Sequence, residues 1–117
     1  MQIETVLAVT VGGFLAWNVG RMFLGKVAPA KARELVNAGA ALLDVRTPGE
    51  FGSGHVRGAK NFPVQELASR MGELGAKNEP IVVYCASGVR SAAAKSMLMR
   101  AGFTDVHDLG AMARWPG

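Results

Sequence analysis

The chain has 117 residues, enough for one compact domain and a short additional segment. Its formal net charge of +4 raises the question of a nucleic-acid partner. The sequence contains no basic run, no RNA-binding aromatic cluster and no zinc-ligand spacing. We therefore expect no nucleic acid among its partners, no metal and no cofactor. The single cysteine, Cys85, excludes a disulfide within the chain.

Residues 1–24 are the most hydrophobic part of the sequence. No charged residue lies between Thr5 and Gly20, and the apolar side chains would surround a helix on all sides. With a rise of about 1.5 Å per residue, a helix over residues 6–24 would span about 28 Å, close to the thickness of a bilayer core. We therefore predict an N-terminal apolar helix that anchors the chain in a membrane by a single span, followed by one domain over residues 25–117.

The charges that flank this segment indicate its orientation. Lys26, Lys31 and Arg33 follow it, and no Lys or Arg precedes Arg21 at its edge. The positive-inside tendency then places the C-terminal domain in the cytoplasm. Two alternatives remain open. The segment could be a signal peptide that is cleaved on export, since residues 28–30 weakly resemble a cleavage site, or it could be a buried or partner-binding helix.

Residues 25–117 alternate between helical and extended patterns. Pro29 and Gly39 frame a first helix over residues 29–38, because proline suits the first turn and glycine the position after the last. Apolar spacing predicts helices over residues 64–74 and 91–101, with a short helix or turn at 47–51. Short apolar runs predict strands over residues 41–45, 60–62, 81–84 and 105–109. The alternation indicates an α/β fold with a mainly parallel sheet covered by helices on both faces.

The loop over residues 85–91 is the most informative motif. It follows the strand predicted at 81–84 and opens a helix, so backbone amides and the helix dipole converge on Cys85. Such a place stabilises an anion, and the thiolate anion is the nucleophilic form of cysteine. Gly88 supplies the conformational freedom that a tight curl of amides requires. We therefore expect Cys85 to be a nucleophile rather than a packing residue.

Arg90, Ser87 and Ser91 add polar groups to this loop. Arg90 offers a two-pronged positive group that suits an oxyanion. The two serines could donate hydroxyl hydrogen bonds or cap the helix. Four residues separate Cys85 from Arg90, one fewer than in cysteine-dependent phosphatases and the related arsenate reductases. We expect a cradle that suits one sulfur atom and is tight for phosphate.

Asp44 and Arg46 lie at the carboxyl end of the strand predicted at 41–45. Sites in parallel sheets form at such ends. An Asp and an Arg two residues apart are more often an ion pair than catalytic groups, so we expect them to support the site.

From about residue 25 to its end, the chain resembles the rhodanese domain family. The motifs that carry the resemblance are residues 44–48 with 50–51, residues 54–55 with 58–59, and residues 61–63, 85–91 and 102–103 with Trp115. The resemblance implies a sheet of about five strands flanked by helices. It also implies sulfurtransferase chemistry through a persulfide on Cys85.

The resemblance also assigns roles by position. Cys85 accepts the sulfur, backbone amides cradle the outer sulfur atom, and three residues support the loop; the cradle is Ala86, Ser87, Gly88, Val89 and Arg90, and the supports are Asp44, Arg46 and Ser91. The expected donor is thiosulfate or a persulfide, and the expected acceptor is a thiol or cyanide. The alternative is a membrane-tethered binding module or thiol sensor without enzymatic activity.

Two positions depart from the pattern of the family. Arg57 stands where proline is most common, and Ala111 follows Gly110 where a second glycine is common. We expect neither residue to touch the cysteine loop.

Overall fold

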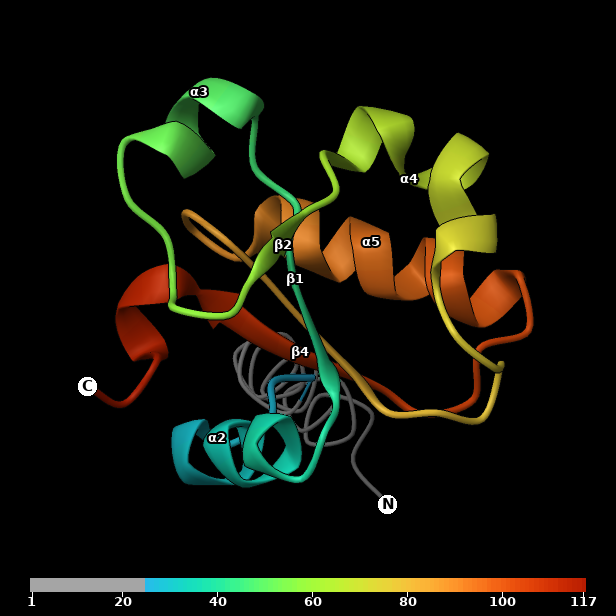
Figure 1. Cartoon of the computed structure of the whole chain (residues 1–117), viewed down its shortest axis with the longest axis horizontal. Coiled ribbons are helices and arrows are strands. Elements are labelled where there is room, and N and C mark those ends of the chain that lie inside the picture. The colour runs from blue at the N-terminus through green and yellow to red at the C-terminus, as the bar shows by residue number, and fades with distance from the viewer. Residues whose placement is uncertain (1–24) are drawn as a thin grey trace, which may run out of the picture.

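A computed structural model describes residues 25–117 of the chain, in which helices and strands alternate (Figure 1). The predicted apolar helix, the membrane anchor over residues 6–24 and the signal-peptide alternative lie outside the described residues. Within residues 25–117, no helix is both long enough and apolar enough to cross a bilayer.

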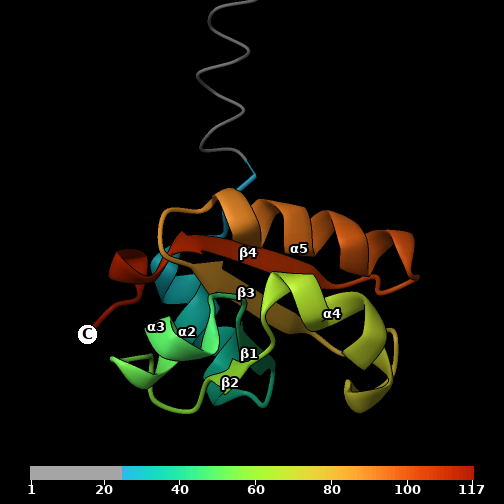
Figure 2. The ribbon, with the colours of Figure 1, turned by 90° about the horizontal axis from the view of Figure 1, so that it is seen from above.

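The described chain contains one sheet of four strands, namely β1 (Ala41–Asp44), β2 (Lys60–Asn61), β3 (Ile81–Cys85) and β4 (Val106–Ala111). The strands lie in the order β2-β1-β3-β4, and each neighbouring pair is parallel (Figure 2). The carboxyl ends of β1 and β3 therefore meet at one edge, where Asp44 is the register partner of Tyr84. This edge carries Cys85, as the sequence predicts.

The expectation of about five strands is wrong for the part of the chain that the structure describes. Lys26 forms a single parallel bridge with Asp108 of β4, and the Val27 amide donates to the Asp108 carbonyl oxygen over 2.8 Å. Pro29 then begins the first helix. At Pro29 the chain turns away from β4, the outermost strand on this side of the sheet. Within residues 25–117, this bridge therefore takes the place of a fifth strand.

The helices follow the predicted order with shifted ends; they are α2 (Pro29–Asn37), α3 (Pro48–Gly52), α4 (Val64–Arg70) and α5 (Val89–Arg100), with 3-10 turns η1 (Met71–Glu73) and η2 (Met112–Arg114). The single helix expected over residues 64–74 is α4 followed by η1. Helix α5 starts two residues earlier than the start predicted at Ser91. That shift brings the helix N-terminus closer to Cys85.

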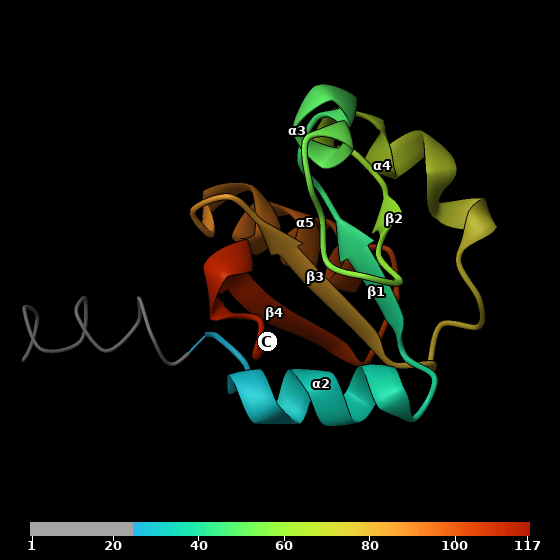
Figure 3. The same cartoon turned by 60° about the vertical axis from the view of Figure 1, so that its left-hand side comes forward.

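The sheet is buried on both faces, and β3 is buried along its whole length. Alternate side chains of a strand point to opposite faces. Val83 and Cys85 accordingly belong to the core beneath α4 and α5, whereas Val82 and Tyr84 belong to the core beneath α2. Figure 3 shows α2 on one side of the sheet and α4 and α5 on the other. The pleat of β3 therefore directs the Cys85 thiol toward the start of α5.

Candidate active site

Cys85 is the last residue of β3, and α5 begins at Val89, so a very short loop connects strand to helix. Gly88 lies at the N-cap with a φ of +104°, in the left-handed region that favours glycine. A Cβ at this position would lie 3.5 Å from the Cα of Gly110, an ordinary contact. Backbone conformation rather than space therefore requires glycine here.

The Sγ atom of Cys85 accepts two backbone hydrogen bonds at the start of α5. The Gly88 amide donates over 3.0 Å and the Ser91 amide over 3.3 Å. The N-cap residue is glycine and has no side chain to accept from the helix. The first amides of a helix have no hydrogen-bond acceptor within the helix. The sulfur of Cys85 is the acceptor here. Of the two roles predicted for Ser87 and Ser91, neither residue caps the helix, whereas Ser91 does supply a hydroxyl hydrogen bond.

The Ser91 hydroxyl links the sulfur to the loop. Ser91 is fully buried. The Cys85 thiol donates toward Ser91 Oγ over 3.5 Å, and this hydroxyl donates to the Gly88 carbonyl oxygen over 3.1 Å. When the thiol loses its proton, the same hydroxyl can rotate to donate to the sulfur.

Two opposing effects determine the pKa of the Cys85 thiol. Burial raises this pKa because it disfavours the charged form. Hydrogen bonds from the Ser91 hydroxyl and from the amides of Ser91, Gly88 and Ser87 lower it, and together they outweigh burial. The pKa of the thiol therefore lies below its usual value, as a nucleophilic cysteine requires.

The thiol is nevertheless covered. Cys85 has no exposed surface, whereas Ala86, Ser87 and Val89 are exposed. The outer side of the loop therefore faces solvent and the sulfur lies beneath it.

Arg90 does not have the free two-pronged face that the sequence suggests. Its Nη1 donates to Glu50 Oε1 over 2.6 Å, and its Nη2 donates to Glu50 Oε2 over 3.0 Å. Glu50 lies in α3 and belongs to a capping box with Thr47. We did not predict a role for Glu50, although the pattern Thr47-x-x-Glu50 is a sequence signature of this box.

Asp44 and Arg46 form the expected ion pair, which is buried. Arg46 Nε donates to Asp44 Oδ1 over 3.0 Å, and Nη2 donates to Oδ2 over 2.7 Å. The same Nη2 donates to the Gly54 carbonyl oxygen over 2.7 Å. The pair therefore ties the segment after α3 to the end of β1. Its link to the cysteine is indirect and passes through Tyr84, whose ring lies 5.9 Å from the Arg46 guanidinium.

Lys26 reaches the cysteine loop, although the sequence suggested only a charge beside a membrane. Its Nζ donates to Asp108 Oδ2 over 2.6 Å and to the Gly88 carbonyl oxygen over 3.4 Å. Asp108 Oδ1 in turn accepts the Gly110 amide over 2.8 Å. No sequence pattern joins Lys26 to residues so far along the chain, so this contact could not be predicted.

The expectation that Ala111 lies away from the cysteine is also wrong. The register between β3 and β4 shifts between Val83 and Tyr84, which makes Ala111 the partner of Cys85. The extra residue in β4 forms a bulge beside the site. Arg57, the other departure from the family pattern, lies in an exposed turn.

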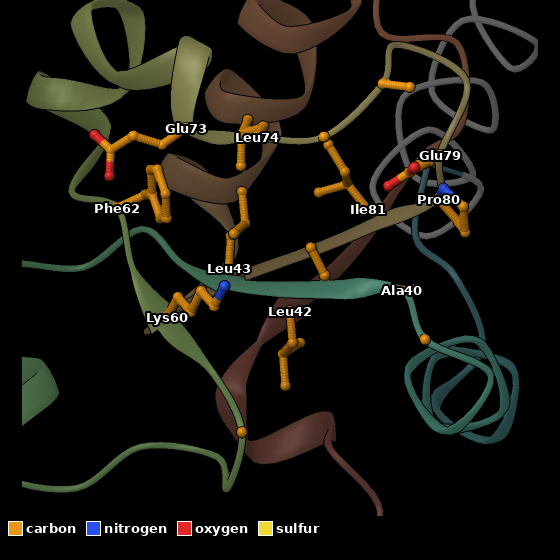
Figure 4. Close-up of a pocket in the computed structure, with 15 residues that line it drawn as sticks. Ala40, Leu42, Leu43, Lys60, Phe62, Glu73, Leu74, Glu79, Pro80 and Ile81 are labelled. Carbon is orange, nitrogen blue, oxygen red and sulfur yellow. The ribbon is translucent and has the colours of Figure 1, made fainter.

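A cavity of about 370 Å³ lies at the opposite edge of the sheet (Figure 4). It is lined by residues at the amino ends of β1 and β3, among them Ala41 and Ile81, and by Lys60, Phe62 and Leu74. None of the predicted site residues lines it. Over residues 25–117, no group of three or more histidine, cysteine, aspartate or glutamate side chains is placed to hold a metal ion.

The fold is a parallel α/β sheet, and its strand β3 ends at a cysteine whose sulfur accepts hydrogen bonds from amides at the start of a helix. These features define a cysteine-dependent domain with an anion-stabilising loop. The profile of the rhodanese-like domain family matches residues 28–116, and the chain belongs to that family.

Similar proteins agree with this assignment. The Bacillus subtilis protein YqhL is 39% identical over 67% of this chain, which spans 62% of the length of YqhL. Thiosulfate sulfurtransferase 16 of the Arabidopsis thaliana chloroplast is 37% identical over 72% of this chain and 80% of its own length. The structure of the human single-domain sulfurtransferase TSTD1 matches with a TM-score of 0.69 and 27% identity, covering 78% of this chain and 94% of that one. With Cys85 in its loop, the chain is a rhodanese-type enzyme.

Proposed function

We propose that the chain moves sulfane sulfur from thiosulfate or a persulfide donor to a thiol or cyanide, through a persulfide on Cys85. The Cys85 thiolate attacks the outer sulfur of the donor. The S–S or S–sulfonate bond of the donor breaks, and a thiolate or sulfite leaves with the bonding electron pair. The acceptor thiolate or cyanide then attacks the outer sulfur of the persulfide, and Cys85 leaves as the thiolate.

The observation that carries this proposal is the pair of amide hydrogen bonds from Gly88 and Ser91 to Sγ, at 3.0 and 3.3 Å. Thiolate and persulfide are both anions, and the charge moves from Sγ to the outer sulfur when sulfur is taken up. The N-terminus of the helix and the amides of the loop favour negative charge at both positions. We assign the outer sulfur to the curl of backbone that follows the cysteine; it comprises Ala86, Ser87, Gly88, Val89 and Arg90.

Intact mass spectrometry tests the proposal directly. Incubation of the full chain with thiosulfate or with a thiol persulfide should add the mass of one sulfur atom. Cyanide should remove that mass and release thiocyanate, and Cys85→Ser should show neither change. The proposal fails if the wild-type chain gains no sulfur from either donor while the protein is folded.

A binding module without enzymatic activity is the second candidate, and one observation favours it. Cys85 has no exposed surface, as is common for a cysteine that only packs in a core. A binding module would keep its fold and stability in Cys85→Ser and would gain no sulfur in the mass experiment.

We also propose that residues 6–24 anchor the protein in a membrane with the catalytic domain in the cytoplasm. The proposal is supported by the uncharged sequence between Thr5 and Gly20 and by the basic residues that follow it. Fractionation of cells that express the full chain or residues 25–117 tests it. The full chain should sediment with membranes and the shortened chain should not. Release of a shortened full-chain product outside the cytoplasm would instead support signal-peptide cleavage.

A further inference from the structure

The contact between Glu50 and Arg90 bears on which sulfur donor the enzyme takes. We propose that Glu50 is a specificity-determining residue that favours donors of low negative charge, such as thiol persulfides, over the thiosulfate dianion. The inference rests on the proposed sulfurtransferase function and concerns the class of donor within it.

The first argument is geometric. The Glu50 carboxylate meets the two terminal nitrogens of Arg90 at 2.6 and 3.0 Å, which is the bidentate arrangement that an incoming oxyanion would need. Thiosulfate can use this face of Arg90 only by displacing Glu50. A donor that does not require the guanidinium avoids this competition.

The second argument is that Glu50 is held in place from its own side. Its Oε1 accepts the Thr47 amide and the Thr47 hydroxyl, each over 3.1 Å, and the Glu50 amide donates back to Thr47 Oγ1 over 3.2 Å. Arg90 and this capping box hold the pKa of Glu50 at about 2. The carboxylate is therefore ionised and positioned throughout the neutral range.

The third argument is the balance of charge around the loop. Three cations near the site each have a carboxylate oxygen within hydrogen-bond distance; the pairs are Lys26 with Asp108 at 2.6 Å, Arg46 with Asp44 at 2.7 Å and Arg90 with Glu50 at 2.6 Å. A fourth cation, Arg114, lies beside Gly110 and donates to the Leu109 carbonyl oxygen instead. Apart from Arg114, the pull on an anion therefore comes from the loop amides and the N-terminus of α5. Amides suit the single charge of a thiolate or persulfide, whereas a dianion also meets repulsion from the Glu50 carboxylate.

Two donors that differ in charge can be compared because they react by the same displacement. Attack of the Cys85 thiolate on thiosulfate, which has two negative charges, breaks its S–S bond and releases sulfite. Attack on benzenethiosulfonate, which has one, breaks the corresponding bond and releases benzenesulfinate. Both reactions leave the same persulfide on Cys85, and neither needs an oxidant or a reductant.

Kinetics of Glu50→Gln with these two donors test the proposal. Glutamine keeps the capping box and removes the charge. Because Coulomb repulsion scales with donor charge, KM for thiosulfate should fall about tenfold and KM for benzenethiosulfonate about threefold. Glu34→Gln is the matched control, because Glu34 is an exposed carboxylate on α2, and should change neither KM. Equal changes for the two donors, or no change beyond that of Glu34→Gln, would overturn the proposal.

Two further measurements distinguish an effect of the Glu50 charge from an effect on the fold or on turnover. Thr47→Ala weakens the capping box but keeps the carboxylate, so it should lower stability without changing the ratio of the two KM values. Sulfate protection of Cys85 against iodoacetamide needs no turnover, and sulfate should bind Glu50→Gln about tenfold more tightly than the wild type. If the wild type forms no persulfide but sulfate binding changes in this way, the sulfurtransferase function fails and the charge argument stands. If the persulfide forms but sulfate binding does not change, the donor proposal fails alone.

Discussion

The amide of Ser91 donates to the sulfur of Cys85 over 3.3 Å, and through this contact the sulfur caps the helix whose amides lower the pKa of the thiol. The third amide of a helix has no partner within the helix. The sulfur provides one, and in return the amide favours the thiolate. Reactivity and local stability therefore depend on the same atom.

The stability of the protein should rise with pH around the titration of Cys85. Its pKa is lower in the folded chain than in the unfolded one, so the thiolate stabilises the fold. This stabilisation is complete above the unfolded pKa of about 8.5 and is lost as the pH falls through the folded pKa. Urea denaturation of wild type and Cys85→Ser between about pH 6 and about pH 9.5 should show a difference in unfolding free energy that grows with pH. A difference that shrinks with pH would contradict the assignment.

Ser91→Ala should make Cys85 less reactive. The variant removes a hydroxyl that lowers the pKa of the thiol, so the pH profile of alkylation by iodoacetamide should move to higher pH. Loss of one hydrogen bond to an anion predicts a rate of persulfide formation at neutral pH about three- to tenfold lower. Ser69→Ala is the control, because Ser69 is exposed and its hydroxyl donates to the carbonyl oxygen of Glu66 within α4. An unshifted profile in Ser91→Ala would show that the hydroxyl has no part in ionisation.

Gly88→Ala should both destabilise the fold and slow sulfur transfer. The φ of +104° at this position is strained for any residue with a Cβ and costs about 1–2 kcal/mol. Relief of that strain moves the Gly88 amide away from Sγ, so persulfide formation should slow by more than the loss of stability explains. Thermal unfolding and the mass assay measure the two effects. Gly52→Ala has open space and no positive φ, and both measurements should remain near wild type.

Asp44→Asn should destabilise the domain strongly. It removes the carboxylate that meets the buried Arg46 at 2.7 Å and leaves an uncompensated buried charge, which costs about 3–5 kcal/mol. Urea denaturation measures the loss. The exposed pair of Arg70 and Glu73 offers a contrast, and Glu73→Gln should have little effect because water screens it. Similar losses of unfolding free energy in the two variants would show that the buried Asp44–Arg46 pair stabilises the domain no more than an exposed pair does.

Local patterns predicted the order of helices and strands well and their ends less well. The apolar run of β3 and the proline and glycine around α2 indicate their elements through short-range sterics. The start of α5 was missed by two residues because serine is a common N-cap. In the folded chain Gly88 is the N-cap residue, and the sulfur of Cys85 accepts the hydrogen bond that a serine side chain would otherwise accept. Known sequence patterns of helix caps do not include a sulfur from the preceding strand.

The sequence by itself determined that a lone thiol follows a buried strand and opens a helix, because backbone preferences within a few residues decide that arrangement. Only the tertiary structure decided which charged side chains pair with one another around the thiol. Glu50 and Arg90 are 40 residues apart, and Lys26 and Asp108 are 82 apart. Their pairing follows from the packing of α3, β4 and α5 around one edge of the sheet. No periodicity or spacing encodes which distant charges meet, so the pairing of these charges around Cys85 became visible only in the folded chain.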